Sequence, residues 1–153
     1  MSHYREYNYE GIIKPGFCDD IEKIIAARDW NAAGGRIEEL CSNNFIDYIA
    51  FPQSGSGLEM SFSKEDRRLV YECEFTRAIF EDMGRFARIL LPAITEKIIS
   101  FKAWDEYHYD ENEHPIEEDL TRQFETDMRN NAEYPRDLPR CIHGGWGYYF
   151  GYV

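Results

Sequence analysis

Long hydrophobic runs are missing from this sequence. No apolar stretch approaches the length of about 18 residues that a membrane-spanning helix requires. Residues 1–10 are polar and rich in tyrosine, unlike the hydrophobic core of a secretion signal. These absences exclude a membrane-spanning helix and argue against secretion, so we expect a cytosolic protein.

Paired cysteines are missing as well. None of the four cysteines belongs to a Cys-x-x-Cys pair, because they stand at Cys18, Cys41, Cys73 and Cys141. In a chain of 153 residues without a secretion signal, this spacing is typical of reduced thiols rather than of a disulfide framework. We predict no disulfide and, as the oligomeric state, a monomer or homodimer.

Catalytic and cofactor motifs are absent too. The sequence contains no Gly-x-Ser-x-Gly nucleophile elbow and no calcium-binding loop of the EF-hand type. Gly55-x-Gly57 precedes a predicted strand, whereas a nucleotide-binding glycine loop opens a helix. We therefore predict no cofactor, and the sequence favours a protein that is not an enzyme.

Positive charge is scarce in one segment. The net charge of the chain is −12, and residues 105–127 carry ten acidic residues against a single base, Arg122. The segment thus accounts for −9 and the rest of the chain for only −3. Such a field repels nucleic acid and anionic membranes, and it attracts basic proteins or divalent cations. The function classes that remain are those with a positively charged partner.

A single domain is predicted from the length and from one dominant core segment. Between Thr76 and Ile94, apolar residues recur at the three- and four-residue steps of a helix face, and Pro92 predicts a kink or an end of that helix. After Thr95 the period falls to two, which predicts a strand. The residues expected in this core are Ile79, Phe80, Met83, Phe86, Ala87, Leu90, Leu91, Ile94, Ile99, Phe101 and Ala103.

The remaining elements are predicted from alternation, caps and turn residues. Helices are expected from Asp19 to the break at Asn31, over 36–41, and over 115–128 with acids in the first turn. Strands are expected over 7–13, 45–51, 58–63, 69–75 and 146–153. This order predicts an α+β fold: an antiparallel sheet with helices mainly on one face, a ferredoxin-like core, an added acidic helix and a C-terminal strand.

The acidic segment is the leading candidate for a binding surface. It has two interpretations, a solvated helix and turn or a docking surface for a basic protein, and aromatic residues among the acids favour the second. Acidic side chains can occupy a groove that otherwise holds phosphates, as acidic nuclease inhibitors do. The predicted partner-binding residues are Trp104, Asp105, Glu106, Tyr107, Tyr109, Asp110, Glu111, Glu113, Glu117, Glu118 and Asp119.

The resulting hypothesis is a small acidic inhibitor of a basic, nucleic-acid-processing partner, in the manner of a phage-encoded anti-defence protein or a toxin immunity protein. The alternative is a small metal-dependent hydrolase or ligand-binding enzyme that uses the His108/His114 turn or the Cys141/His143 region. Neither spacing matches a zinc pattern. We therefore assign no metal ligand and no catalytic residue from the sequence.

Overall fold

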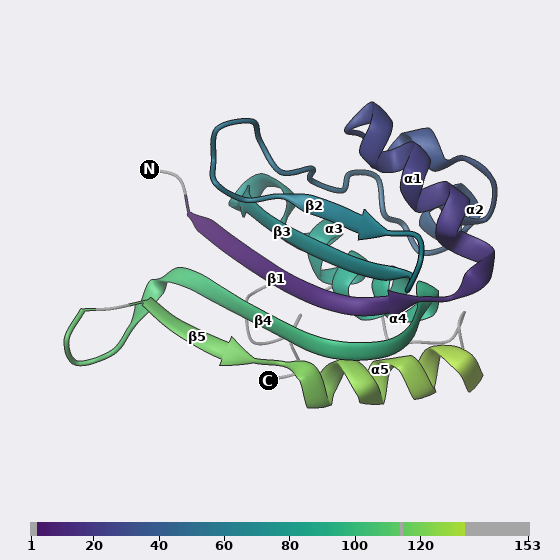
Figure 1. The fold of residues 1–153 in the computed structure, drawn as a ribbon. Helices are drawn as coiled ribbons and strands as arrows, with labels where there is room; N and C mark the ends of the chain where they lie inside the picture. Colours follow the sequence, from purple (N-terminus) through teal and green to yellow (C-terminus); the bar gives the residue numbers. More distant parts are fainter. Residues whose placement is uncertain (1–2, 114, 134–153) are drawn as a thin grey trace.

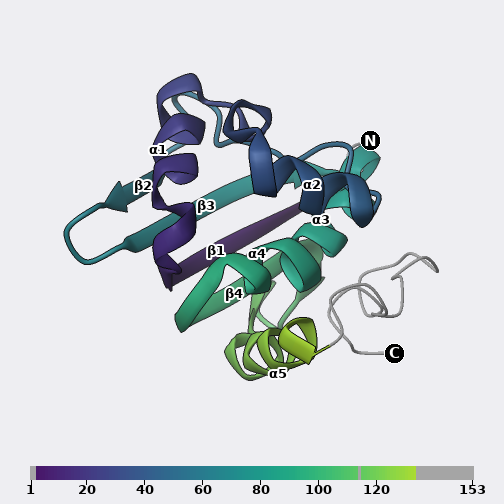
Figure 2. The same ribbon diagram turned by 90° about the vertical axis from the view of Figure 1, so that its right-hand side faces the viewer.

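The structure is a computed structural model that describes residues 3–113 and 115–133. It is an α+β fold built on an antiparallel sheet with the strand order β2-β3-β1-β4-β5 (Figure 1, and turned by 90° in Figure 2). The strands are β1 (Tyr4–Ile13), β2 (Met60–Ser63), β3 (Arg68–Thr76), β4 (Thr95–Tyr109) and β5 (Pro115–Asp119). The helices are α1 (Cys18–Ala27), α2 (Gly35–Asn43), α3 (Phe80–Arg85), α4 (Leu91–Ile94) and α5 (Thr121–Glu133).

The helices lie on one side of the sheet. Ile21 of α1, Met83 of α3 and Phe124 of α5 belong to one buried cluster with Tyr7 and Tyr9 of β1, and in Figure 1 the strands stand in front of α3 and α4. Within residues 3–113 and 115–133, no helix or strand passes in front of the sheet in the view of Figure 1. The sheet therefore has one covered face and one open face.

The covered face is apolar because the side chains of a strand alternate between its two sides. β1 buries every second residue, including Tyr7 and Tyr9, and these pack against helical residues such as Phe124. The Tyr7 hydroxyl donates to the Met83 carbonyl at 3.2 Å, which satisfies a polar group inside the core. The predicted strand at 7–13 and the hairpin are confirmed; β3 buries alternate residues, and β2 buries Met60 and partly buries Phe62.

The predicted core helix is confirmed, and Pro92 acts differently from a simple stop. A π-helical turn, Phe86–Leu90, separates α3 from α4, and the chain continues through Pro92 for one more turn to Ile94. Pro92 has no N–H to donate, and its ring conflicts with the carbonyl one α-turn earlier. The wider turn next to it absorbs this misfit, so the apolar face continues and Leu90 is fully buried.

Residues 45–51 are not a strand, contrary to the prediction. Phe45 adopts a positive φ of 58°, and the segment then runs irregularly over α3. Its backbone finds partners other than a neighbouring strand: Tyr48 N donates to Asp82 Oδ2 at 3.0 Å, and Ala50 N lies 3.4 Å from Met83 Sδ. Apolar alternation was present, but these backbone groups bond to side chains of α3 instead of pairing with a strand.

Ile99 is not in the core, also contrary to the prediction. The register of β1 against β4 passes from Glu10↔Ser100 to Gly11↔Ile98, so Ile99 is an extra residue in a β-bulge and is 42% exposed. Ile98 packs against the core instead. Glycine is required opposite the bulge, because a Cβ on Gly11 would lie 2.4 Å from the Tyr9 hydroxyl oxygen.

Residues 115–119 form strand β5 and not the first turn of an acidic helix. Pro115 stands at the start of this strand, where its missing N–H is tolerated, and the ladder to β4 continues as far as the bond from Leu120 N to Phe101 O at 2.8 Å. The helix begins only at Thr121, and Ile116 is 42% exposed instead of lying on the helix stripe.

The remaining expectations concern cysteines, membranes and the C-terminus. Cys18, Cys41 and Cys73 are free thiols, whereas Cys141 and the predicted strand 146–153 lie outside the described residues. No helix in the described part of the chain has the length and apolar character needed to span a membrane.

Candidate partner-binding surface

The acidic segment is divided between several elements. Residues 105–127 run from the end of β4 through a turn and β5 into α5, so their acids do not share one surface. Some of them face the open side of the sheet, some lie at the turn, and two are inside the protein. Which acids a partner can meet depends on this division.

Asp105 is buried, which corrects its assignment to the binding surface. Its side chain points to the covered face, where Arg5 Nε donates to Oδ2 at 2.8 Å and His3 Nε2 lies 2.7 Å from Oδ1. Arg5 is itself buried and stacks over the Phe80 ring at 3.9 Å. An acid held inside by a cation does not present its charge to a partner, so Asp105 is a structural residue.

Asp127 is the second buried acid of the segment. Its Oδ1 accepts from Arg88 Nη2 at 3.1 Å and from Gln123 Nε2 at 3.2 Å. Burial raises the pKa of the Asp127 carboxyl, and the Arg88 guanidinium opposes this shift. Asp127 joins α5 to the helical segment around Arg88 and is not a surface charge.

The open face of the sheet gathers acids from four strands. In β1 and β3 the apolar residues take the covered face, so the intervening acids take the open face. Directly paired positions extend the set across the sheet, with Glu6 opposite both Glu74 and Trp104, and Trp104 opposite Glu117. We call this surface the acidic sheet face; its acids are Glu6, Glu10, Glu72, Glu74, Glu106, Glu117 and Asp119, and its bases are Arg68, Lys97 and Lys102.

The charges of the acidic sheet face are only partly compensated. Arg68 pairs with Glu10, and Lys102 lies 3.8 Å from Glu117. Burial raises the pKa of the Glu74 carboxyl, and repulsion by Glu6 and Glu106 raises it further. Seven acids against three bases leave an excess of negative charge on this face.

Neither a protein-family model, nor a curated protein, nor a solved structure matches this chain.

The turn between β4 and β5 carries the other predicted site residues that reach solvent. Tyr109 is 48% exposed, and Asp110, Glu111 and Glu113 are exposed beside it. Asp110 shapes the turn, because its Oδ1 accepts from Asn112 N at 2.8 Å and its carbonyl accepts from Glu113 N at 3.0 Å. These residues project from the end of the sheet, next to the acidic sheet face but not on it.

The remaining predicted residues fall elsewhere. Glu118 pairs with Ala103, a residue of the covered face, and is half-buried at the sheet margin. The backbone of Tyr107 and His108 belongs to β4, but their side chains, like His114, Cys141 and His143, are outside the described part of the structure.

The described residues do not assemble a metal centre or a reactive thiol. Among them, no group of three or more His, Cys, Asp or Glu side chains is arranged to hold a metal ion. Burial raises the pKa of Cys73 to about 12 and that of Cys41 to about 11. These two thiols stay protonated at neutral pH, and a protonated thiol is a poor nucleophile and a poor metal ligand.

Sequence reasoning missed four acids of the site, namely Glu6, Glu10, Glu72 and Glu74. Their alternation with apolar residues was visible, and it indicated that one side of each strand faces water. Placing these acids beside Trp104 requires the strand order, in which β1 lies between β3 and β4.

Proposed function

We propose that this protein is a small acidic cytosolic binding protein that inhibits a basic, nucleic-acid-processing partner, of the type used as phage anti-defence inhibitors or toxin immunity proteins. The observation that carries the proposal is the acidic sheet face, which collects seven carboxylates from four strands around Trp104. A protein that only needs a solvated sheet surface gains nothing from placing Glu6 directly opposite Glu74.

The geometry suits competition with nucleic acid. Neighbouring strands lie about 4.8 Å apart, so the carboxylates form a dense and stiff array of negative charge. Such an array repels nucleic acid and attracts the basic groove that binds it, which speeds association. The turn acids Asp110, Glu111 and Glu113 extend the field beyond the end of the sheet.

Trp104 supplies an anchor among these charges. It is half-buried between Glu6 on β1 and Glu117 on β5. Aromatic residues surrounded by polar groups are the usual high-energy contacts of an interface, because they lose water on binding while the rim keeps its water. Tyr109, at the exposed turn, is the second aromatic residue that we assign to the surface.

We also propose that the first four strands form a ferredoxin-like core. The element order, a strand, helices, two strands, helices and a strand, supports this assignment, as does the sheet order β2-β3-β1-β4 with β1 and β3 in the middle. β5 and α5 then extend the core at the β4 edge and enlarge the acidic sheet face.

The test is an inhibition assay against purified nucleases with pI values above about 9, with acidic nucleases as the negative panel. We expect inhibition of at least one basic nuclease that weakens as salt rises, because the attraction is electrostatic. The variant Glu6→Gln/Glu72→Gln/Glu74→Gln/Glu117→Gln should raise the half-inhibitory concentration tenfold or more. Trp104→Ala should speed dissociation about tenfold, which corresponds to about 1.4 kcal/mol.

The matched control removes the same amount of charge elsewhere. Its substitutions, Glu38→Gln/Glu39→Gln/Glu65→Gln/Glu125→Gln, are at exposed positions outside the acidic sheet face. Inhibition should change by less than about twofold if the location of the charge decides binding. Equal losses in both variants would mean that only net charge matters, and a panel without any inhibited basic nuclease would refute the proposed function.

A further inference from the structure

Strand β3 is longer than the strand beside it at the outer side of the sheet. β2 pairs with β3 only from Arg68 to Tyr71, and one further bond joins Glu72 N to Glu59 O at 2.9 Å. The last part of β3, through Thr76, pairs with β1 on its inner side. Within the described ranges, no strand pairs with its outer side.

The backbone groups at this free edge point outward. Glu72 N donates toward β2, whereas Arg77 N donates to His3 O at the start of β1, and the direction alternates from one residue to the next. The N–H groups of Glu74 and Thr76 and the carbonyl of Glu74 therefore face away from β1. The Glu74 carbonyl has only the weak Cys73 Sγ donor, at 3.6 Å, in the described structure.

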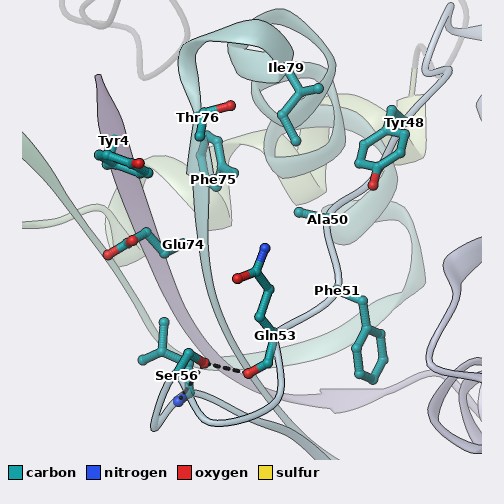
Figure 3. Close-up of a pocket in the computed structure, with 11 residues that line it drawn as sticks. Tyr4, Tyr48, Ala50, Phe51, Gln53, Ser56, Glu74, Phe75, Thr76 and Ile79 are labelled. Carbon is teal, nitrogen blue, oxygen red and sulfur yellow. Dashed lines mark hydrogen bonds between the residues drawn. The ribbon is translucent and has the colours of Figure 1, made fainter. Parts of the chain in front are cut away.

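A groove with a volume of about 320 Å³ lies along this edge. Figure 3 shows Glu74, Phe75 and Thr76 along one wall, and Gln53 projecting into the space between the walls. The opposite wall is the irregular segment 48–58, which includes Tyr48 and Phe51. A free edge beside a groove of this size offers both main-chain bonds and side-chain contacts.

The opposite wall is held in place rather than loose. Arg28 Nη2 donates to Pro52 O at 2.7 Å, and Ser56 Oγ donates to Gln53 O at 2.7 Å. The Tyr71 hydroxyl donates to the Ala50 carbonyl from beneath. The wall thus keeps its distance from β3, although it has no regular secondary structure.

The two sides of the free edge differ chemically. A residue placed opposite Glu74 would direct its side chain to the acidic sheet face, beside Glu74 and Glu6. Residues before and after it would direct theirs to the other side, toward Phe75, Ile79 and Phe51 in the groove. Charge complementarity therefore favours a basic residue opposite Glu74, and burial in the groove favours apolar residues immediately before and after it.

We propose that the free edge of β3 at Glu74–Thr76 binds an extended segment of the basic partner as an additional antiparallel strand, with a lysine or arginine opposite Glu74 and apolar residues on either side. This inference rests on the proposed function, because it takes the partner to be basic. The edge offers few main-chain bonds, so the segment gives register and specificity while the acidic sheet face attracts the rest of the partner.

The test uses the full chain and a fluorescently labelled peptide, Val-Lys-Val-Lys-Val-Lys-Val, in a binding titration. In antiparallel pairing the lysine amides face β3 and the valine amides face away from it. N-methylation of the lysine amides should abolish binding, whereas N-methylation of the valine amides should change the affinity by less than about threefold. The peptide with Glu in place of Lys should not bind.

Protein variants locate the site independently. Glu74→Lys should weaken peptide binding at least tenfold, whereas the control Glu38→Lys, on exposed α2, should leave it within twofold. In NMR spectra the amide signals of Glu74 and Thr76 should shift on titration, and circular dichroism melts check that both variants are folded.

Several results would overturn this inference. The first is equal binding of the two methylated peptides, and the second is an equal loss of peptide binding in Glu74→Lys and Glu38→Lys. The third is the absence of saturable binding by the full chain at about 1 mM peptide, which is expected if another part of the chain or a second copy covers the edge. If the peptide fails but basic nucleases are still inhibited, only the docking mode is wrong. If the peptide binds but no basic nuclease is inhibited, the proposed function is wrong.

Discussion

The two faces of the sheet are built from the same strands but are determined by different forces. On the covered face, Tyr7, Tyr71 and Phe101 are buried against helices, and loss of their packing would cost stability. On the open face, Glu6 and Glu74 repel one another, and neither is needed for burial. The covered face therefore explains why the chain folds, and the open face carries the charges on which the proposed function rests.

The neighbours Asp105 and Glu106 show the same contrast within two residues. Asp105 points to the covered face and is 1% exposed beside Arg5. Glu106 points to the open face, and its Oε1 accepts from Tyr4 N at 2.9 Å. Two adjacent acids in one acidic segment thus have a structural and a surface role, and only the strand alternation distinguishes them.

Among substitutions that test this difference between the two faces, Asp105→Ala should cause the largest loss of stability. This substitution removes the carboxylate that pairs with the buried Arg5 guanidinium, and loss of one partner of a buried ion pair costs about 3–5 kcal/mol. Glu106→Ala, one residue away on the open face, should cost about 1 kcal/mol or less. Urea unfolding measures both, and equal losses would show that Asp105 is not inside.

Leu90→Ala tests the helical layer that covers the sheet. Leu90 is fully buried behind the strands, so its truncation should lower the free energy of unfolding by about 2–5 kcal/mol. Glu81→Ala, on the exposed side of α3, serves as the control and should change it by about 0.5 kcal/mol or less. A loss below about 1 kcal/mol for Leu90→Ala in chemical denaturation would place this helix outside the core.

Substitutions of Ile98 and Ile99 test where the β-bulge changes the side of the sheet to which the side chains of β4 point. Ile98 packs against the core while Ile99 is on the open side, so Ile98→Ala should cost about 1–2 kcal/mol and Ile99→Ala about 0.5 kcal/mol or less. Thermal unfolding of the two variants gives the comparison. The reverse order would indicate a regular strand without the bulge.

The smallest effect on stability, and the only increase in it, is expected for Glu74→Gln. Glu74 is directly opposite Glu6, and removal of a like-charged cross-strand pair should stabilise the protein by about 0.2–1 kcal/mol at pH 7. The pKa of Glu74 is raised in the folded state, so the unfolded state binds fewer protons and wild-type stability falls as pH rises through that pKa.

The pH dependence of the added stability of Glu74→Gln serves as the control for this prediction. The gain should be complete above the folded-state pKa of Glu74 and should vanish below the unfolded value, where the wild-type carboxyl is protonated. Unfolding measured from pH 7 down to about 3 tests this, since an ordinary Glu titrates near 4.3. A gain that stays constant over this range would exclude charge repulsion as its cause.

The covered face was largely predictable because burial imposes a period on the sequence. The alternation of Tyr7 and Tyr9 in β1, the hairpin and the helix around Leu90 were all read correctly from spacing. Residues 45–51 show the limit of this reasoning, because an alternating segment becomes a strand only if a neighbouring strand accepts its hydrogen bonds.

The open face was less predictable because it depends on strand order and register. The acids at 117–119 carry local signals for a helix start, but pairing with β4 overrides them, and Asp119 ends up accepting from Thr121 N at 3.0 Å just before α5. The bulge at Ile99 depends on Gly11, a residue of another strand. Neither effect is visible within a local window of the sequence.

The central position of β1 has a consequence for how the protein is made. β1 is the first strand along the chain, yet its partners are β3 and β4, and the pair Arg5–Asp105 spans 100 residues. Contacts so distant in sequence make folding slow, and no sheet can close around β1 until β4 has left the ribosome. We expect ribosome-bound chains that end before Thr95 to be cut rapidly by protease, and chains released past α5 to become resistant. During synthesis Tyr7 and Tyr9 therefore stay exposed for longer than any other core residues, which makes β1 the segment that a chaperone would need to shield.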